Sequence, residues 1–463
     1  EWGVTPVVSY DAVGRVTKFQ NPDQTLRTAT HSPWLETAHD ENDNDDTVGN
    51  THKNTPTLTH FDPLGRPFLV QADNGTESSP DHYNTRSILD IENQPLAVID
   101  PLARTCQTHV FTMTGRLLLE TNLDKGARTT FADVTGAPIR RWDERAQVFR
   151  WEYDPLRRPT HLWVKIGAAA EILLERRYYG DNPNLTNPQD DNLRGQLVLV
   201  FDQAGKSELG PFDFKGNLRT SARTLATVYD TTLDWSALAS ITTPSTAEST
   251  AASALESETF TETRAYDALD RIVSLITHDA SELIPTYNEA SLLEAVDVRL
   301  RGASAATRFV RNIDYDAKGQ RTWIEYGNTT TKVTTSYTYH ELTFRLTHLV
   351  TTRASDSKKL QDLSYTHDPV GNITAIADDA DDEVFFVNTV ASASQSFSYD
   401  PLYRLISATG REHKAQGDVQ IGVDGAPLQN LPHTNDSTAV RTYLEEYEYD
   451  PVGNILELFH NAG

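Results

Sequence analysis

The chain has 463 residues, and its 41 basic and 66 acidic side chains give a formal net charge of −25. This charge argues against a nucleic-acid partner, because binding to phosphates needs a basic surface. The charged fraction of 23% is ordinary for a folded protein, and no apolar run approaches the roughly 18 residues of a membrane-spanning helix. The single cysteine, Cys106, excludes an internal disulfide framework and a cysteine-based zinc site.

One six-residue phrase recurs along the sequence: an aromatic residue, Asp, two variable residues, Gly, and then Arg or Asn. In chain order, copies occupy residues 10–15, 61–66, 111–116, 153–158, 201–206, 266–271, 315–320, 367–372, 399–404 and 449–454. The copies at 10–15, 61–66 and 449–454 are complete. Others are degenerate: 153–158, 266–271 and 399–404 lack the Gly, and 111–116 lacks the Asp. Repetition this dense indicates an array of small structural units.

The phrase has the chemistry of a hairpin turn. Asp can accept hydrogen bonds from backbone N–H groups two residues on, Pro or Ala fits the next position, and Gly permits a positive φ. Aromatic residues alternate with polar ones before the turn, as at Tyr337 and Tyr339, and short β-prone runs follow it, as at residues 404–409. The residues assigned to these structural turns are Asp11, Gly14, Asp62, Gly65, Asp154, Asp202, Gly205, Asp267, Asp316, Gly319, Asp368, Gly371, Asp400, Asp450 and Gly453. The sequence therefore predicts an all-β fold of hairpins that extend one long, curved or spiralling sheet.

Three stretches interrupt the repeats. Residues 36–56 are acidic and predict an exposed excursion, residues 236–258 predict a surface loop or a short helix, and residues 410–440 predict an inserted loop. Residues 168–176 are a local helix candidate, although a strand could equally contain their Ile-Leu-Leu run. Because repeats lie on both sides of each interruption, we expect one continuous β-structure over residues 1–463.

The sequence offers no catalytic or metal-binding constellation. Residues 40–46 could bind calcium, but they lack the sixth-position Gly and twelfth-position Glu of an EF-hand loop, which favours a solvated loop. The sequence contains no P-loop and none of the catalytic or cofactor-binding motifs H-E-x-x-H, G-x-S-x-G and G-x-G-x-x-G. The repeat Asp residues are already explained by their turns. We therefore expect a protein that is not an enzyme, with no catalytic, cofactor-binding or metal-binding residues and no cofactor.

The phrase resembles the YD (tyrosine-aspartate) repeat of the Rhs family, which occurs in bacterial polymorphic toxins, in toxin-complex B and C components and in animal teneurins. The resemblance covers nearly the whole chain. It implies a sheet of hairpins wound into a hollow cocoon around a protein cargo, and a secreted or extracellular protein. The partners it implies are an enclosed toxin polypeptide or a partner shell component, with a cell-surface glycan or receptor as a further candidate.

Complete shells of this family continue from the repeats into a core region and a variable toxic tail. This sequence ends at Gly463 directly after a repeat, so neither protease nor toxin activity is carried over. It begins at Glu1 and its only methionine is Met113, so we expect a piece of a longer protein. Three functions stay open. The favoured one is a non-catalytic shell segment that encloses and carries a toxic polypeptide; the others are a teneurin-like adhesion or carbohydrate-binding module, and a hydrolase whose site the sequence does not reveal.

Overall fold

The computed structural model describes residues 4–47, 50–327, 331–386, 389–414 and 438–462. The chain packs as two compact units. Unit 1 contains Glu1–Cys106, Asp314–Glu325 and Thr329–Gly463, and unit 2 contains Gln107–Ile313 and Tyr326–Asn328. The expectation of a single continuous structure stays a prediction.

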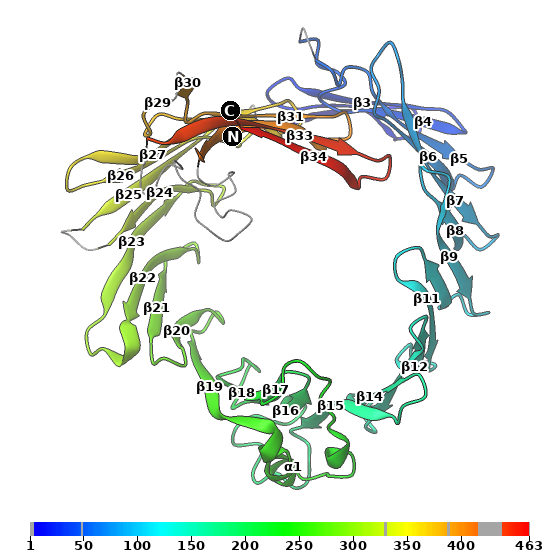
Figure 1. Cartoon of the computed structure of the whole chain (residues 1–463), viewed down its shortest axis with the longest axis vertical. Helices are drawn as coiled ribbons and strands as arrows, with labels where there is room; N and C mark the ends of the chain where they lie inside the picture. Colours follow the sequence, from blue (N-terminus) through cyan, green and yellow to red (C-terminus); the bar gives the residue numbers. More distant parts are fainter. Residues whose placement is uncertain (1–3, 48–49, 328–330, 387–388, 415–437, 463) are drawn as a thin grey trace, which may run out of the picture. The chain divides into compact units, whose positions relative to one another are not determined.

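Strands dominate both units (Figure 1). Of the described strands, 32 belong to one antiparallel sheet, and β29 and β30 form a separate two-stranded sheet. The prediction of an all-β fold built from hairpins is confirmed. The first strands are β1 (Val7–Tyr10), β2 (Val16–Gln20), β3 (Leu26–His31), β4 (Leu35–His39), β5 (Thr57–Phe61), β6 (Pro67–Asp73), β7 (His82–Leu89), β8 (Pro95–Ile99), β9 (Thr105–Phe111), β10 (Leu117–Asn122) and β11 (Gly126–Ala132).

The middle and the end of the chain continue the same pattern. The next elements are β12 (Pro138–Asp143), β13 (Gln147–Tyr153), β14 (Pro159–Ile166), β15 (Ile172–Tyr179), β16 (Leu197–Asp202), β17 (Gly205–Leu209), β18 (Thr220–Ala226), η1 (Ser236–Leu238), α1 (Pro244–Ala251), η2 (Ala252–Ala254), β19 (Leu255–Tyr266), β20 (Ile272–Ile276), β21 (Glu282–Tyr287), β22 (Leu293–Arg299), η3 (Leu300–Gly302) and β23 (Thr307–Tyr315). The last are β24 (Arg321–Tyr326), β25 (Val333–Tyr339), β26 (Leu346–Arg353), β27 (Lys358–His367), β28 (Ile373–Asp378), β29 (Val384–Phe386), β30 (Thr389–Ala391), β31 (Gln395–Tyr399), β32 (Leu405–His413), β33 (Val440–Tyr449) and β34 (Ile455–Ala462). No described helix is long and apolar enough to cross a membrane.

Most repeat phrases close a hairpin whose ladder slips by one residue at the turn, whereas the ladder at residues 201–206 runs without a slip. In the last repeat, Glu448 pairs with Glu457, but Tyr449 then pairs with Ile455. The same slip occurs at Tyr153 in unit 2. This bulge is the geometry expected of a hairpin loop that ends in a residue of positive φ.

The largest buried cluster lies in unit 2, where the helical segment covers β15 and β16 (Figure 1). Leu173, Phe201 and Leu238 are the largest fully buried side chains of the described residues. The stretch 236–258 thus contains the short helix α1, one of its two predicted forms. The helix candidate at 168–176 is instead mostly strand β15, because Leu173 buries its side chain against this cluster.

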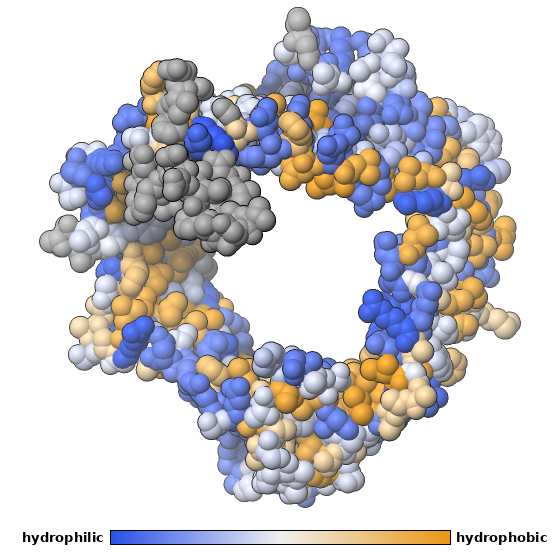
Figure 2. Space-filling model, in the orientation of Figure 1, coloured by the Kyte–Doolittle hydropathy of each residue, from blue (hydrophilic) through white to orange (hydrophobic). Residues whose placement is uncertain are grey.

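Elsewhere the sheet buries few side chains, and Figure 2 shows hydrophobic residues scattered among hydrophilic ones over the visible face. The predicted excursion 36–56 begins inside β4 and forms turns after it. The prediction that it is exposed is wrong at Asn42 and Asp43, which are 3% and 7% exposed. Asn42 contacts Asp368 of a later repeat, and Asp43 is bonded to Asp40 and Thr55 of its own segment. Of the predicted loop at 410–440, residues 415–437 lie outside the described residues, and β32 and β33 occupy its ends.

Candidate functional site

The repeat turn is a small hydrogen-bonded unit, seen clearly at Asp62. Its Oδ1 accepts from the N–H groups of Leu64 (2.9 Å) and Arg66 (3.0 Å), and its Oδ2 accepts from Arg66 Nε at 2.7 Å. Gly65 has a φ of 74°, where a residue with a Cβ is strained. The Arg66 guanidinium, followed by the backbone donors, lowers the pKa of Asp62. The turn therefore uses every recurring residue of the phrase except the aromatic one.

The other sequence-predicted turn residues lie in the same arrangement. A side-chain oxygen accepts from the N–H group four residues on at Asp11, Asp62, Asp154, Asp267, Asp316, Asp368, Asp400 and Asp450. The φ angle is positive at Gly14, Gly65, Gly205, Gly319, Gly371 and Gly453. Copies without Gly keep the positive φ, at Arg157, Asp270 and Tyr403. Asp202 differs, because it closes a tighter turn with Gly205 and pairs with Arg223.

A tyrosine just before the turn links several of the hairpins to the preceding one. Tyr399 donates its hydroxyl hydrogen to the carbonyl oxygen of Ile373 at 2.9 Å, and Ile373 is the fifth residue after Asp368 of the preceding repeat. The same offset from the preceding Asp holds, at 2.7–3.0 Å, for Tyr153 with Pro138, Tyr179 with Pro159, Tyr266 with Leu218, Tyr287 with Ile272, Tyr339 with Arg321 and Tyr449 with Leu405. We call these bonds the hydroxyl ladder.

The arginine that ends the phrase reaches forward to the next repeat. Arg404 Nη1 donates to the Asp450 carbonyl at 2.9 Å, and its guanidinium lies 4.9 Å from the centre of the Tyr449 ring. Arg345 lies outside the copies of the phrase, but it likewise follows a residue of positive φ, Phe344, and donates to the carbonyls of Asp368 and Pro369, both at 2.7 Å. These tyrosine and arginine roles were not predicted. The signal available in the sequence was the preference for Tyr over Phe and the recurrence of Arg after the Gly position.

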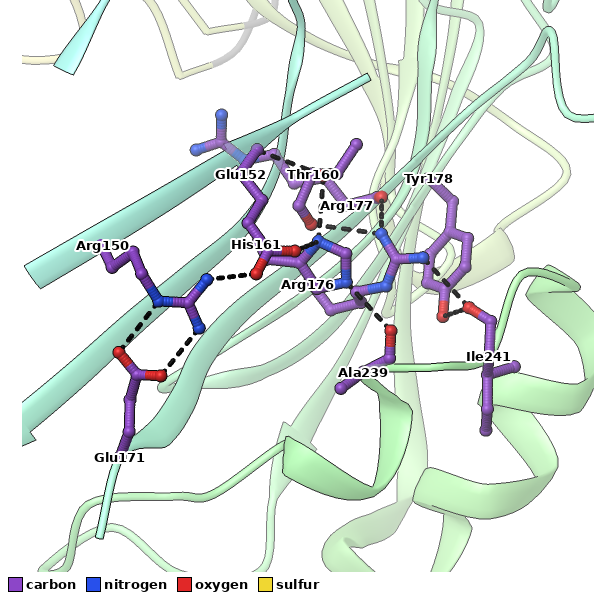
Figure 3. Close-up of polar contacts among 10 residues, drawn as sticks. All are labelled: Arg150, Glu152, Thr160, His161, Glu171, Arg176, Arg177, Tyr178, Ala239 and Ile241. Carbon is purple, nitrogen blue, oxygen red and sulfur yellow. Dashed lines mark hydrogen bonds and ion pairs between the residues drawn. The ribbon is translucent and has the colours of Figure 1, made fainter. Parts of the chain in front are cut away.

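Unit 2 contains a second group of polar contacts, centred on buried Arg176 (Figure 3). Its Nη1 donates to the carbonyls of Thr160 (3.2 Å) and Arg177 (2.9 Å), and its Nη2 donates to that of Ile241 at 3.0 Å. The Tyr178 hydroxyl donates to the same Ile241 carbonyl at 3.0 Å. Burial lowers the pKa of Arg176. These bonds hold the segment before α1 against β14 and β15.

His161 lies beside this group, and its two ring nitrogens are both occupied. Nε2 lies 3.1 Å from the Ala239 carbonyl, while Nδ1 lies 2.9 Å from Thr160 Oγ1 and 3.2 Å from Glu152 Oε2. Burial, followed by the nearby Arg176, lowers the pKa of His161. Nε2 therefore faces a carbonyl oxygen, and Nδ1 faces a hydroxyl and a carboxylate. Both ring nitrogens are engaged by groups of the protein itself, so the ring links β13 and β14 to the segment before α1.

A pocket of about 750 Å³ lies in unit 1. Acidic side chains line it, but they are engaged: Asp43 accepts from Thr55, and Asp73 accepts from the N–H groups of Gly75 and Asp81. Burial raises the pKa of Asp43. Within the described part of the chain, no group of three His, Cys, Asp or Glu side chains could hold a metal ion.

Comparison with known proteins gives relatives of one kind. No protein-family model matches the chain. It is 31% identical over 329 residues to toxin subunit YenC2 of Yersinia entomophaga, covering 68% of this chain and 32% of the relative, and 27% identical over 359 residues to YenC1 of the same organism, covering 76% and 34%. The chain thus spans about a third of the length of these curated relatives. Among solved structures, the crystal structure of TcdB2-TccC3 matches this chain with a TM-score of 0.86 and 26% identity, and the match covers 99% of this chain and 22% of the TcdB2-TccC3 chain. The structure of the Photorhabdus luminescens Tc holotoxin pore matches with a TM-score of 0.86 and 25% identity.

Proposed function

Because this chain belongs to the Rhs/YD-repeat family, we propose that it is a segment of the wall of a toxin-complex shell that encloses and carries a toxic polypeptide. The observation that carries the proposal is how the repeats use their side chains. Asp, Gly and Arg of the phrase build the turn, and Tyr and Arg bond the neighbouring repeat. A wall acts by enclosing, so it needs such linkage between repeats and no catalytic group.

The charge of the chain supports the same role. A net charge of −25 keeps a long sheet soluble and discourages edge-to-edge association. Acidic groups facing a cargo would attract a basic polypeptide in a salt-dependent way, since screened charges act over only about 8–10 Å. In this proposal the protein acts outside the producing cell, its partners are the cargo polypeptide and a further shell component, and it catalyses no reaction itself.

Protection of a cargo from protease tests the proposal. The chain is assembled with a toxin-complex shell component and a basic test polypeptide, and the particle is examined by electron microscopy and then treated with protease. We expect a hollow particle and a cargo that is cut far more slowly than the free polypeptide. A solid particle, or a cargo cut at the free rate, would contradict the proposal. Binding to a glycan array would instead favour the adhesion module.

A further inference from the structure

In unit 1, a loop near the start of the chain contacts repeats near its end. We call residues 40–47 and 50–55 the N-terminal loop. Three hydrogen bonds join it to residues more than 300 positions later: Asn42 Nδ2 to Asp368 Oδ2 (3.0 Å), His52 Nε2 to the Tyr399 carbonyl (3.1 Å), and the Tyr403 hydroxyl to Asp40 Oδ2. An early loop of unit 1 is therefore bonded to the repeats at 367–372 and 399–404.

Tyr403 occupies the position where complete copies of the phrase have Gly, and it keeps the left-handed backbone with a φ of 63°. A bulky aromatic residue in this conformation is an outlier that costs free energy. The other phrase copies that lack Gly place Arg157 and Asp270 there. Tyr403 differs because its hydroxyl bonds Asp40 and its ring stacks on His52, with centroids 5.5 Å apart and planes 11° apart. The strain thus coincides with the contact to the N-terminal loop.

Hydrogen bonds within the N-terminal loop hold Asp40 in place. Asp40 Oδ1 accepts from the N–H groups of Asn42 (2.9 Å) and Asp43 (3.0 Å). Asp43 accepts from the N–H group of Thr55 (2.8 Å) and from its hydroxyl (2.9 Å). These bonds fix Asp40 so that its second oxygen faces the Tyr403 hydroxyl.

The repeat turn that Asn42 contacts, at Asp368, ends in Asn in place of Arg. In a complete copy such as 61–66, Arg66 supplies two guanidinium donors to Asp62 Oδ2. The copy at Asp368 ends in Asn372, which supplies one donor to Oδ2 at 2.8 Å. Asn42 of the N-terminal loop supplies the second donor to the same oxygen. The loop therefore completes a turn that the repeat alone leaves one donor short.

We propose that the N-terminal loop and Tyr403 form a latch that fastens the start of unit 1 to its repeats at 367–372 and 399–404, and that Tyr stands at 403 in place of Gly for this contact. The latch does not depend on the wall function proposed above. It predicts an unusual outcome, because replacing Tyr403 by Gly relieves the backbone of its own turn and yet frees a loop far away in the sequence.

Hydrogen–deuterium exchange of the whole chain tests the latch with three variants. For Tyr403→Gly we expect exchange in the N-terminal loop to rise about tenfold or more, since one hydrogen bond and one ring contact are lost. For Tyr403→Phe, which keeps the ring, we expect a smaller rise of about two- to tenfold. The matched control is Ala103→Gly, at the same turn position in unit 1 with a φ of 60°, which should leave the loop unchanged.

A second measurement separates the latch from general destabilisation. The thermal midpoint of Tyr403→Gly should not fall below that of the parent chain, because the strained residue is gone, while exchange in the loop rises. Equal loop exchange in Tyr403→Gly and Ala103→Gly would overturn the latch. If Tyr403→Gly does not fold, Tyr403→Phe decides alone, and parent-like loop exchange in that variant would also overturn it.

Discussion

The hydroxyl ladder makes a specific prediction at Tyr287, whose hydroxyl donates to the Ile272 carbonyl at 2.9 Å. Replacing Tyr287 by Phe removes this donor and keeps the ring, so the stacking of Arg271, 4.5 Å from the ring centre, is retained. A hydrogen bond of this kind contributes about 0.5–1.5 kcal/mol, and the carbonyl loses its donor. A loss of about 1 kcal/mol corresponds to about a fivefold change in an opening equilibrium.

Hydrogen exchange in peptides from β20 and β21 measures that opening directly. We expect Tyr287→Phe to exchange about two- to tenfold faster there than the parent chain, with little change in β25 and β26 of unit 1. Tyr229→Phe is the matched control, because Tyr229 is 98% exposed. If the two variants exchange alike, the hydroxyl contributes nothing and strand pairing alone holds the repeats together.

Three further predictions concern the turns and the Arg176 contacts. Gly65→Val should lower the free energy of unfolding by about 1–3 kcal/mol in chemical denaturation, because the φ of 74° is strained for Val. The new Cβ meets no atom within 4 Å, so the backbone strain is the cause, and an unchanged denaturation midpoint would refute it. The hydrogen bond from the backbone N–H of Arg15 is the largest cause that lowers the pKa of Asp11 to about 2, so carboxyl NMR should show its titration midpoint there. The stabilisation that this carboxylate provides is complete above the ordinary pKa of 3.8 and is lost as the pH falls through about 2. A midpoint near 3.8 would contradict this prediction. Arg176→Met should cost about 3 kcal/mol, since the carbonyls of Thr160 and Arg177 lose the guanidinium donor at ~1–3 kcal/mol each. Exchange around Ile241 should also rise, because its carbonyl keeps the Tyr178 hydroxyl and loses Arg176. Parent-like stability would show that water replaces the guanidinium.

The turns could be predicted from the sequence because their chemistry is local. Asp62 and Arg66 are four residues apart, and the Gly between them fixes the backbone. The all-β fold follows from repeating that local unit. The role of the tyrosine hydroxyl could not be predicted in the same way, because its acceptor lies in the preceding repeat and is a backbone carbonyl with no residue preference.

Two other features depended on distant partners. The acidic composition around Asn42 is typical of a solvated loop, and its burial follows from the contact with Asp368, 326 residues later. The stretch at 168–176 has good helix formers, but Leu173 gains more from burial in the unit 2 cluster than its neighbours gain from helix formation. In both places tertiary contacts outweigh local preference.

The hydroxyl ladder also bears on how such a chain can change its length during evolution. Its donor and acceptor are defined by their offsets from two turns, and nothing in the bond depends on how many residues lie between them. Tyr287 bonds a residue 15 positions earlier, whereas Tyr266 bonds Leu218 across 48 positions that include α1. An insertion that loops out between two turns therefore leaves the bond across it intact, and a duplicated hairpin brings a donor and an acceptor of its own.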